Sequence, residues 1–354
     1  MRQGSASVEF IGVDKAYGSV YAVRGVSFTI GAGQLVTLLG PSGCGKTTTL
    51  RLIAGLEIAT AGRIMIGARD VTNFSAADRD VSMVFQSYAL FPHMSVLDNV
   101  AYGPDVQGAG KVKAREMAME KIRLVGLAGL EARAPSELSG GQQQRVAVAR
   151  ALVLEPQVLL FDEPLSNLDA KLRRRVREEI RELQQNLKLT VAYVTHDQEE
   201  ALAVSDRIIV MADARIAQMG TPHELYEQPK DLFVADFIGD ATILDGVVEA
   251  VSDGRARVRL GEAALDLPAR GVKPGPVKIA VRPHSFELHG QKPAAPSLSG
   301  KISKAAYLGK HLEYTVETAL GALFVVAPVG VDALHAGADV HVTLAERGVV
   351  IVTE

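Results

Sequence analysis

The chain has 354 residues, a formal net charge of -3, 47% hydrophobic and 22% charged residues, and a single cysteine. This length suits two domains, and the small net charge offers no electrostatic footprint for nucleic acid or an anionic bilayer. One cysteine excludes an internal disulfide, and the sequence has neither an apolar run long enough to span a membrane nor a secretory signal. We therefore expect a cytosolic protein that reaches a membrane only through another chain.

The N-terminal two thirds of the chain alternates apolar strand-like runs with helical patterns. "QLVTLLG", "PQVLLFDEP" and "TVAYVTHD" are continuous apolar runs, each of which ends in a loop or in charged residues. Such strands separated by helices are typical of a buried, mostly parallel sheet of the α/β class. We expect this domain over residues 1-238, with a helical subdomain at about 88-155 that contains "KVKAREMAMEKIRLVGL".

The segment "GPSGCGKT" joins an apolar strand to a predicted helix, and it matches the P-loop pattern in full. Its glycines permit a tight curl in which backbone N–H groups face phosphates. Lys46 supplies a positive charge for the β- and γ-phosphates of ATP, and Thr47 supplies a hydroxyl for Mg²⁺. We expect the Cys44 side chain to point away from the nucleotide as a spacer. The predicted ATP-binding residues here are Gly40, Pro41, Ser42, Gly43, Cys44, Gly45, Lys46, Thr47 and Thr48.

Polar residues follow three further apolar strands, at the end of the sheet where ligands bind in open α/β folds. Asp162 and Gln86 are candidate ligands of Mg²⁺, and Gln86 could also reach the attacking water. Glu163 could polarise that water, and His196 could sit at the γ-phosphate as a neutral donor or acceptor. Each of these residue types also occurs at strand ends for purely structural reasons. After His196, Asp197 and Glu200 have capping-box spacing for the next helix.

A second candidate anion site is the stretch "LSGGQQQR", where Ser139, Gly140, Gly141 and Gln142 open a predicted helix. The first turn of a helix leaves N–H groups free and carries the positive end of the helix dipole. A helix start with no ligand is the alternative. Downstream, "LDAKLRRRVREEIRELQQNL" predicts a helix with a solvated, charged face.

The sequence pattern changes after about residue 238, where short runs rich in β-forming residues alternate with glycine and proline. Residues 239-354 therefore predict a small, mostly antiparallel β-barrel or sandwich.

The motifs resemble, in order, those of ATP-binding cassette (ABC) ATPases over nearly all of the first 235 residues. The stretches that carry this resemblance are "GPSGCGKT", Gln86, "LSGGQQQR", "LLFDEP", "LSNLD" and "VTHD". They look like the Walker A, Q-loop, signature, Walker B, D-loop and H-loop motifs of that family. The resemblance implies an α/β P-loop cassette, followed by a barrel-like domain of the OB/TOBE type.

The family resemblance also implies partners and roles that the spacing alone does not. Two cassettes pair head to tail, so that Ser139, Gly140, Gly141 and Gln142 would bind ATP held by the other copy, with Asp169 coupling the two sites. Tyr17 would stack on adenine, with packing on the core as the alternative. The region Tyr88-Met94 would receive an integral membrane permease subunit, although core packing is the alternative for Leu90 and Phe91.

The tail, "GTPHELYEQPKDLFVADFIGD" and the β-rich domain, resembles importer cassettes for maltose, polyamines, sulfate, ferric iron and phosphonates. The implied function is that of an ATP-hydrolysing, energy-coupling subunit of a bacterial import system. Such a subunit is peripheral, on the cytoplasmic side of the inner membrane. Its indirect partner is a periplasmic binding protein, and no nucleic acid is expected as a partner. Ferric iron is favoured, and phosphonate, spermidine/putrescine, sulfate and sugar stay open. A soluble cassette ATPase outside transport and a P-loop kinase are rivals. His284 stands where such relatives carry an acid, so no regulatory residue is assigned.

Overall fold

The computed structural model describes residues 4–330, 333–345 and 347–352. The chain divides into two compact units, Met1–Pro222 and His223–Glu354. The expected boundary between residues 238 and 239 stays a prediction. It differs from this division by the helices α7 (Pro222–Glu227) and α8 (Leu232–Phe237).

The first unit is organised around a six-stranded sheet with the order β10-β9-β3-β8-β7-β6. The strands are β3 (Leu35–Leu39), β6 (Val81–Val84), β7 (Val158–Asp162), β8 (Thr190–Val194), β9 (Arg207–Ala212) and β10 (Arg215–Gly220). All neighbours pair in parallel except β9 and β10. Every residue of β3 and β8 is buried, because helices and a second sheet cover a parallel sheet from both sides. The predicted α/β fold with a mostly parallel sheet is confirmed.

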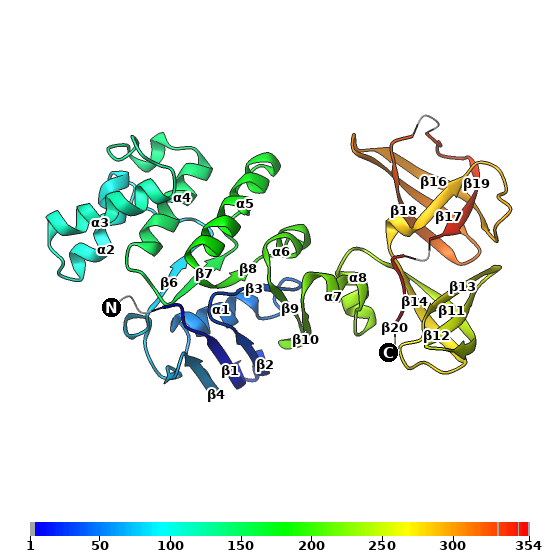
Figure 1. Ribbon diagram of the computed structural model, residues 1–354, viewed down its shortest axis with the longest axis horizontal. Helices are drawn as coiled ribbons and strands as arrows, with labels where there is room; N and C mark the ends of the chain where they lie inside the picture. Colours follow the sequence, from blue (N-terminus) through cyan, green and yellow to red (C-terminus); the bar gives the residue numbers. More distant parts are fainter. Residues whose placement is uncertain (1–3, 331–332, 346, 353–354) are drawn as a thin grey trace. The chain divides into compact units, whose positions relative to one another are not determined.

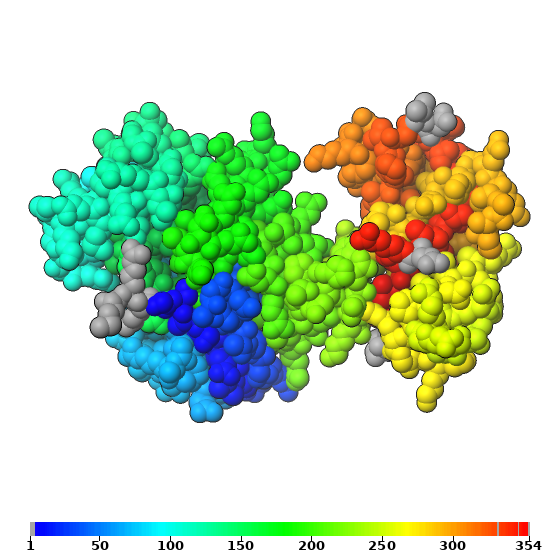
Figure 2. All heavy atoms as spheres, viewed as in Figure 1, coloured from blue at the N-terminus to red at the C-terminus, as the bar shows by residue number. Residues whose placement is uncertain are grey.

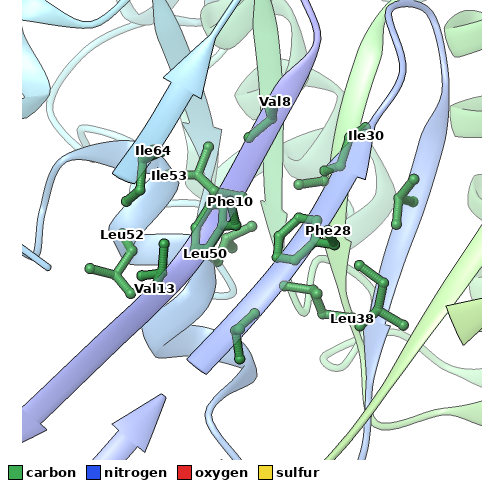
Figure 3. Close-up of a cluster of buried hydrophobic side chains, with 14 of the residues drawn as sticks. Val8, Phe10, Val13, Phe28, Ile30, Leu38, Leu50, Leu52, Ile53 and Ile64 are labelled. Carbon is green, nitrogen blue, oxygen red and sulfur yellow. The ribbon is translucent and has the colours of Figure 1, made fainter. Parts of the chain in front are cut away.

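A smaller antiparallel sheet, in the order β2-β1-β4-β5, supplies much of the main core of this unit. Its strands are β1 (Val8–Tyr17), β2 (Val20–Ile30), β4 (Ala61–Ile66) and β5 (Arg69–Asp70). Figure 3 shows Phe10 and Phe28 beside side chains of α1 (Lys46–Ala54), and the two rings stack with centroids 4.6 Å apart. This packing anchors the helix whose first residues, Lys46 and Thr47, end the P-loop motif.

The segment between β6 and β7 is helical and has an apolar core of its own. It contains α2 (Val96–Val106), α3 (Lys111–Leu124), the 3-10 turn η2 (Pro135–Glu137) and α4 (Gly140–Leu152). Figure 2 shows the residues of α2 and α3, in cyan, as a lobe of the first unit. The lobe is joined to the sheet by α4, whose apolar residues belong both to its core and to that around β7 and β8.

The remaining helices of this unit are α5 (Ala170–Leu187) and α6 (Gln198–Val204), and the 3-10 turn η1 spans Ala76–Asp78. α5 buries Val176, Ile180 and Gln184 and leaves its other residues at least partly exposed. The predicted solvated face is therefore present. Arg175 and Glu179, four residues apart, form an ion pair of 3.2 Å on it.

The second unit contains two five-stranded antiparallel sheets around one shared apolar core. The first sheet comprises β11 (Thr242–Ser252), β12 (Arg255–Leu260), β13 (Ala263–Pro268), β14 (Gly275–Val281) and β20 (Val349–Val352). The second comprises β15 (Phe286–His289), β16 (Leu298–Tyr307), β17 (His311–Thr318), β18 (Gly321–Pro328) and β19 (Asp339–Leu344), with the turn η3 (Pro283–Ser285) before β15. Figure 1 shows these strands in yellow to red, and the predicted barrel-like β domain is confirmed.

A buried arginine ties α7 and α8 to this β domain. Arg282 is 1% exposed, and its guanidinium donates hydrogen bonds to the backbone carbonyl oxygens of Tyr226, Ala235 and Ile238. It also lies 4.3 Å from the centroid of the Tyr226 ring. A buried cation needs such partners, so the two helices pack as part of the second unit.

Within the described part of the chain, no helix combines the length and apolar character needed to cross a membrane.

Candidate nucleotide site

Four neighbouring strands of the six-stranded sheet end in residues singled out by the sequence. β3 leads into the P-loop, β8 into Thr195 and His196, β7 ends at Asp162 before Glu163, and β6 ends shortly before Gln86. The pairing register sets Asp162 beside Val194, the last residue of β8. Because the four strands run parallel, the chain brings these residues to one edge of the sheet, where α/β proteins bind ligands.

The P-loop is shaped by glycines at two points of close backbone approach. A Cβ atom on Gly40 would lie 2.3 Å from the carbonyl oxygen of Met211. One on Gly45 would lie 2.2 Å from the carbonyl oxygen of Ala22, and Gly45 also has a φ of 106°. A side chain at either position would push the loop off β9 or β2. The sequence pattern therefore has a steric cause here.

The Lys46 side chain folds back over this loop. Its residue is 7% exposed, and its ammonium donates hydrogen bonds to the carbonyl oxygens of Gly40 at 2.7 Å and Pro41 at 2.8 Å. The crest of the loop, residues 41–43, is exposed. Cys44 is buried instead, and this burial raises the pKa of its thiol. The cysteine side chain thus faces the interior of the unit.

Asp162 and Glu163 form an adjacent acid pair at the end of β7. Burial and the neighbouring Glu163 charge raise the pKa of Asp162, while Arg51 and a hydrogen bond from Thr47 oppose this. The Thr47 hydroxyl thus lies near enough to the Asp162 carboxylate to influence its pKa. A half-buried carboxylate whose ionised form is disfavoured, with a hydroxyl nearby, offers oxygen ligands of the kind that a hard divalent cation prefers.

Glu163 is set apart from Asp162 by its backbone. It has a φ of 46°, which a non-glycine residue rarely adopts, and its N–H donates to the carbonyl oxygen of Val194 at 3.0 Å. This turn brings Glu163 Oε2 within 3.1 Å of His196 Nδ1. The His196 side chain is 61% exposed, so its free edge faces solvent.

The structure places Gln86 at this edge but leaves its amide group exposed. Its backbone carbonyl accepts a hydrogen bond of 3.0 Å from Asn167 Nδ2, which ties the end of β6 to the loop after β7. Over residues 4–330, 333–345 and 347–352, no cluster of three or more His, Cys, Asp or Glu residues could hold a metal by itself. A metal here would need Thr47, Asp162 and phosphate oxygens together.

The signature turn forms the N-terminus of α4. The Ser139 hydroxyl accepts a hydrogen bond from Gln142 N, and Gln142 Oε1 accepts one of 2.9 Å from Ser139 N, which is a capping box. A Cβ on Gly140 would lie 3.0 Å from Leu168, and one on Gly141 2.9 Å from Leu172. The two glycines thus let the turn lie against the start of α5.

Asp169 caps α5, because its side chain accepts hydrogen bonds from the backbone N–H groups of Lys171 and Leu172. Ser139 and Asp169 are both exposed. Among the described residues, no hydrogen bond joins the signature turn to the P-loop. One copy of the chain thus presents two separate candidate anion sites.

The loop after Gln86 is only partly exposed to solvent. Tyr88 is 6% exposed and packs in the apolar cluster around β7 and β8, so its expected place in an exposed docking region is wrong. The tyrosine is drawn inward because Tyr88 and Ala89 both have positive φ values, of 59° and 49°. Leu90 is half-buried against the same cluster, as the core alternative predicted. Phe91 is half-buried, and its ring packs at a tilt of 56° against that of Tyr102, with ring centroids 4.8 Å apart.

Two residues that the sequence analysis passed over hold this loop. Arg150 of α4 donates to the carbonyl oxygens of Tyr88 at 3.1 Å and Ala89 at 2.8 Å. Asn99 is fully buried in α2, and its amide binds the backbone of Phe91 on both sides. The sequence signal that could have identified Asn99 is its position: it is the one polar residue on the face of α2 that is otherwise apolar and buried, and a buried amide needs hydrogen-bond partners.

The predicted capping box after His196 forms only in half. Asp197 accepts a hydrogen bond of 3.0 Å from Glu200 N and caps α6. The Glu200 side chain does not return to Asp197 N, because it turns inward to Tyr193 and Thr195. The sequence analysis did not predict that the Glu200 side chain would be buried.

Tyr17 lies at the end of β1 and is 51% exposed. The alternative that it packs on the core is therefore wrong. Lys15 Nζ lies 4.8 Å from the centre of its ring. Burial, followed by a hydrogen bond with Glu57, raises the pKa of the Tyr17 hydroxyl.

Comparison with known proteins decides the family. Residues 23–166 match a family model described as "ABC transporter", and residues 279–352 match one described as "TOBE domain". The chain is 59% identical over 346 residues, 98% of both chains, to "Fe(3+) ions import ATP-binding protein FbpC 1" of Rhizobium meliloti (strain 1021). The chain belongs to the ABC transporter family. The predicted family and the ATPase class are thereby confirmed.

Further relatives of this ABC protein cover much or nearly all of its length. A protein named "Fe(3+) ions import ATP-binding protein FbpC" from Brucella abortus (strain 2308) is 56% identical over 98% of both chains. One from Haemophilus influenzae (strain ATCC 51907 / DSM 11121 / KW20 / Rd), named "Fe(3+) ions import ATP-binding protein FbpC 1", is 50% identical over 87% of this chain and 93% of its own.

Solved structures support the cassette fold of the first unit. The ATP-binding cassette MJ0796, in a dimeric post-hydrolysis state bound to ADP and Pi, is 32% identical, with a TM-score of 0.54. The match covers 61% of this ABC protein and 98% of that chain. This fold is one that binds adenine nucleotides, as the sequence predicted.

Proposed function

We propose that the chain is the ATP-hydrolysing, energy-coupling subunit of a bacterial ABC importer for ferric iron. The observation that carries the proposal is the identity of 55–59% over nearly the whole length to proteins named as ferric iron import ATP-binding proteins. The match includes the β domain, so it extends beyond the cassette that all ABC proteins share. Iron would be the cargo of the assembled system and would not bind the cassette.

The substrate of the chemical step is ATP, held by the P-loop. The exposed crest of the loop would supply N–H groups to the phosphates, and Lys46 would exchange its bonds to Gly40 and Pro41 for phosphate oxygens. Tyr17 would stack on the adenine through the face that Lys15 leaves open. The full set of ATP-binding residues predicted from the sequence stands as part of this proposal.

Thr47, Asp162 and Gln86 would hold Mg²⁺. The lowering effect of the Thr47 hydroxyl on the pKa of Asp162 supports this, because it places the two side chains near one another, and Gln86 would have to turn toward them. The cation would neutralise charge on the β- and γ-phosphates when bound. Its positive charge would also lower the pKa of Asp162, whose ionised form is disfavoured by burial in its absence.

Glu163 would act as the base that orients and polarises the attacking water. Its carboxylate lies beside His196, and that pair is supported by the distance of 3.1 Å between Oε2 and Nδ1. His196 would hold Glu163 through Nδ1 and meet the γ-phosphate with its exposed edge. Attack by the water cleaves the bond between the β- and γ-phosphates and releases ADP and inorganic phosphate.

The site would be completed by a second copy, arranged head to tail. Ser139, Gly140, Gly141 and Gln142 would bind the γ-phosphate of ATP held by the other copy, and Asp169 would link the two sites. The exposure of Ser139 supports this proposal, as does the finding that, among the described residues, no hydrogen bond joins the signature turn to the P-loop of the same chain. The dimeric ADP-bound state of the related cassette adds support from the fold.

The permease would dock on the loop that runs from Leu90 to Met94. A cavity of about 310 Å³ lies next to it, lined by residues that include His93, Met94 and Tyr102. Arg150 and Asn99 would hold this loop in place while the permease is bound. Docking there would locate the chain on the cytoplasmic side of the inner membrane.

Uptake of radioactive ferric iron tests the function. A strain that lacks this gene should lose uptake, regain it with the wild-type chain, and fail to regain it with Glu163→Gln produced at the same level. Uptake of putrescine, sulfate and phosphonate serves as the control for the other solutes. Normal ferric iron uptake in the deletion strain would contradict the proposed cargo.

A further inference from the structure

A buried carboxyl group lies beneath the turn that carries His196. Glu200 is 3% exposed, and its two carboxylate oxygens accept hydrogen bonds from the hydroxyls of Tyr193 and Thr195. Burial raises the pKa of Glu200. Placing an acid here is costly compared with an apolar residue, so the arrangement needs a reason beyond packing.

The Thr195 hydroxyl connects this carboxyl group to the turn. It donates to Glu200 and also accepts a hydrogen bond of 3.0 Å from the backbone N–H of Asp197. The residues on both sides of His196 are therefore tied to one hydroxyl, and that hydroxyl is tied to a side chain fixed in α6.

The opposite side of the turn is held by α5. Arg173 Nη1 lies 3.2 Å from Asp197 Oδ2, and Arg173 Nη2 donates to the carbonyl oxygen of Leu168 in the loop before Asp169. The turn thus sits between a buried anchor at α6 and a surface anchor at α5.

His196 itself has little packing of its own. Its side chain is 61% exposed, and within the described part of the chain the imidazole forms a hydrogen bond with Glu163 Oε2 alone, at 3.1 Å. The direction of the imidazole ring consequently depends on the backbone of the turn.

We propose that Glu200 is a positioning residue for His196, which acts through the Thr195 hydroxyl and the backbone of the turn. This inference rests on the proposed role of His196 at the γ-phosphate. Geometry of this kind matters because a small displacement of a group that meets the reacting atoms slows chemistry without weakening binding.

The first test is Glu200→Gln, which keeps the shape but replaces one carboxylate oxygen with an amide donor. That donor would face a hydroxyl whose acceptor capacity is partly used by Asp197, so the turn should shift. We expect kcat to fall about 10-fold while KM for ATP stays within about twofold. Glu199→Gln is the matched control, because Glu199 is exposed and its substitution removes the same side-chain charge one residue away.

The second test repeats Glu200→Gln in a His196→Ala background, under single-turnover conditions that resolve slow hydrolysis. A positioning role predicts no further loss there, because the group being positioned is gone. An equal loss in both backgrounds would overturn the inference in favour of a general structural role. If His196→Ala alone hydrolyses ATP at the wild-type rate, the proposed role of His196 fails instead.

Thr195 provides a variant that keeps the inference testable should Glu200→Gln fold poorly. Thr195→Val removes the hydroxyl and should lower kcat as Glu200→Gln does, whereas Thr195→Ser should restore it. The double variant Glu200→Gln/Thr195→Val should be no slower than either single variant. Normal kcat in Thr195→Val would overturn the inference.

Discussion

At the scale of single residues, the site depends on side chains that the fold keeps in costly states. Lys46 is buried and its ammonium binds carbonyl oxygens of its own loop, the ionised form of Asp162 is disfavoured, and Glu163 adopts a left-handed backbone. Buried or strained polar groups gathered at one edge of a sheet are characteristic of functional sites. Binding of nucleotide would satisfy the first two.

Glu163→Gln gives the clearest prediction at this scale. We expect steady ATP hydrolysis to fall about 10²- to 10⁴-fold, the contribution usual for a general base, because an amide cannot take up a proton. ATP affinity, measured by equilibrium binding or by thermal shift, should be retained. Hydrolysis at the wild-type rate would contradict the role assigned to Glu163.

Asp162→Asn makes a prediction about pH. The pKa of Asp162 is raised in the folded protein by burial and by Glu163, so its ionised form destabilises the fold above that pKa. The variant should therefore melt at a higher temperature than wild type without ligand at pH 7. The gap should narrow as the pH falls through the raised pKa of the folded state, and it should close below the ordinary pKa of an aspartate, where Asp162 is neutral in both states.

Added Mg²⁺ and ATP should reverse this order of stability. Wild type would gain stability from the cation and nucleotide, while Asp162→Asn would gain less. A variant that is destabilised without ligand, at every pH, would show that Asp162 is instead a favourable ion in the fold.

At the scale of elements, the P-loop is the most constrained segment, since glycine is required where it touches β2 and β9. Its sequence pattern could be predicted because the whole motif is contiguous in the chain, although Gly40 and Gly45 meet the backbone of Met211 and Ala22, which are distant in sequence. The orientation of single side chains could not be predicted in the same way. Tyr88 turns inward through two left-handed residues, and Glu200 leaves its capping box for two hydroxyls. Neither choice is visible in a local pattern.

Alkylation of Cys44 tests the same element. The thiol is buried and its pKa is raised, so N-ethylmaleimide should react slowly at pH 7 and faster as the pH rises. A modified thiol no longer fits in the interior, so the loop should be displaced and we expect ATP binding to be lost. ATP present beforehand should protect the thiol.

Cys44→Ala is the control for this experiment, and its remaining activity should not respond to the reagent. Full ATP binding by protein shown by mass spectrometry to be modified at Cys44 would contradict the prediction.

At the scale of the whole molecule, one copy carries two candidate anion sites that no hydrogen bond connects within its described residues. The sequence predicted the fold class and the strand ends that carry the site. The pairing of two copies was implied only by family resemblance, because a contact between chains leaves no periodicity in either one. The role of the signature turn therefore needs a test across copies.

Ser139→Arg provides that test. Arginine would fill the space that the second copy's γ-phosphate needs, so hydrolysis should fall about 100-fold or more while ATP still binds to the P-loop of the same chain. Ser139→Ala loses the same helix cap without the bulk, and its activity should lie between that of wild type and the arginine variant. Equal activity in all three would show that the turn has no ligand.

The most direct measurement of the central claim is ATP turnover across a dilution series, with the dimer fraction determined by sedimentation on the same samples. Because each ATP site would need the signature turn of a second copy, turnover per chain should follow the dimer fraction and approach zero for monomer. Undiminished turnover in samples that sediment as monomer would contradict the account.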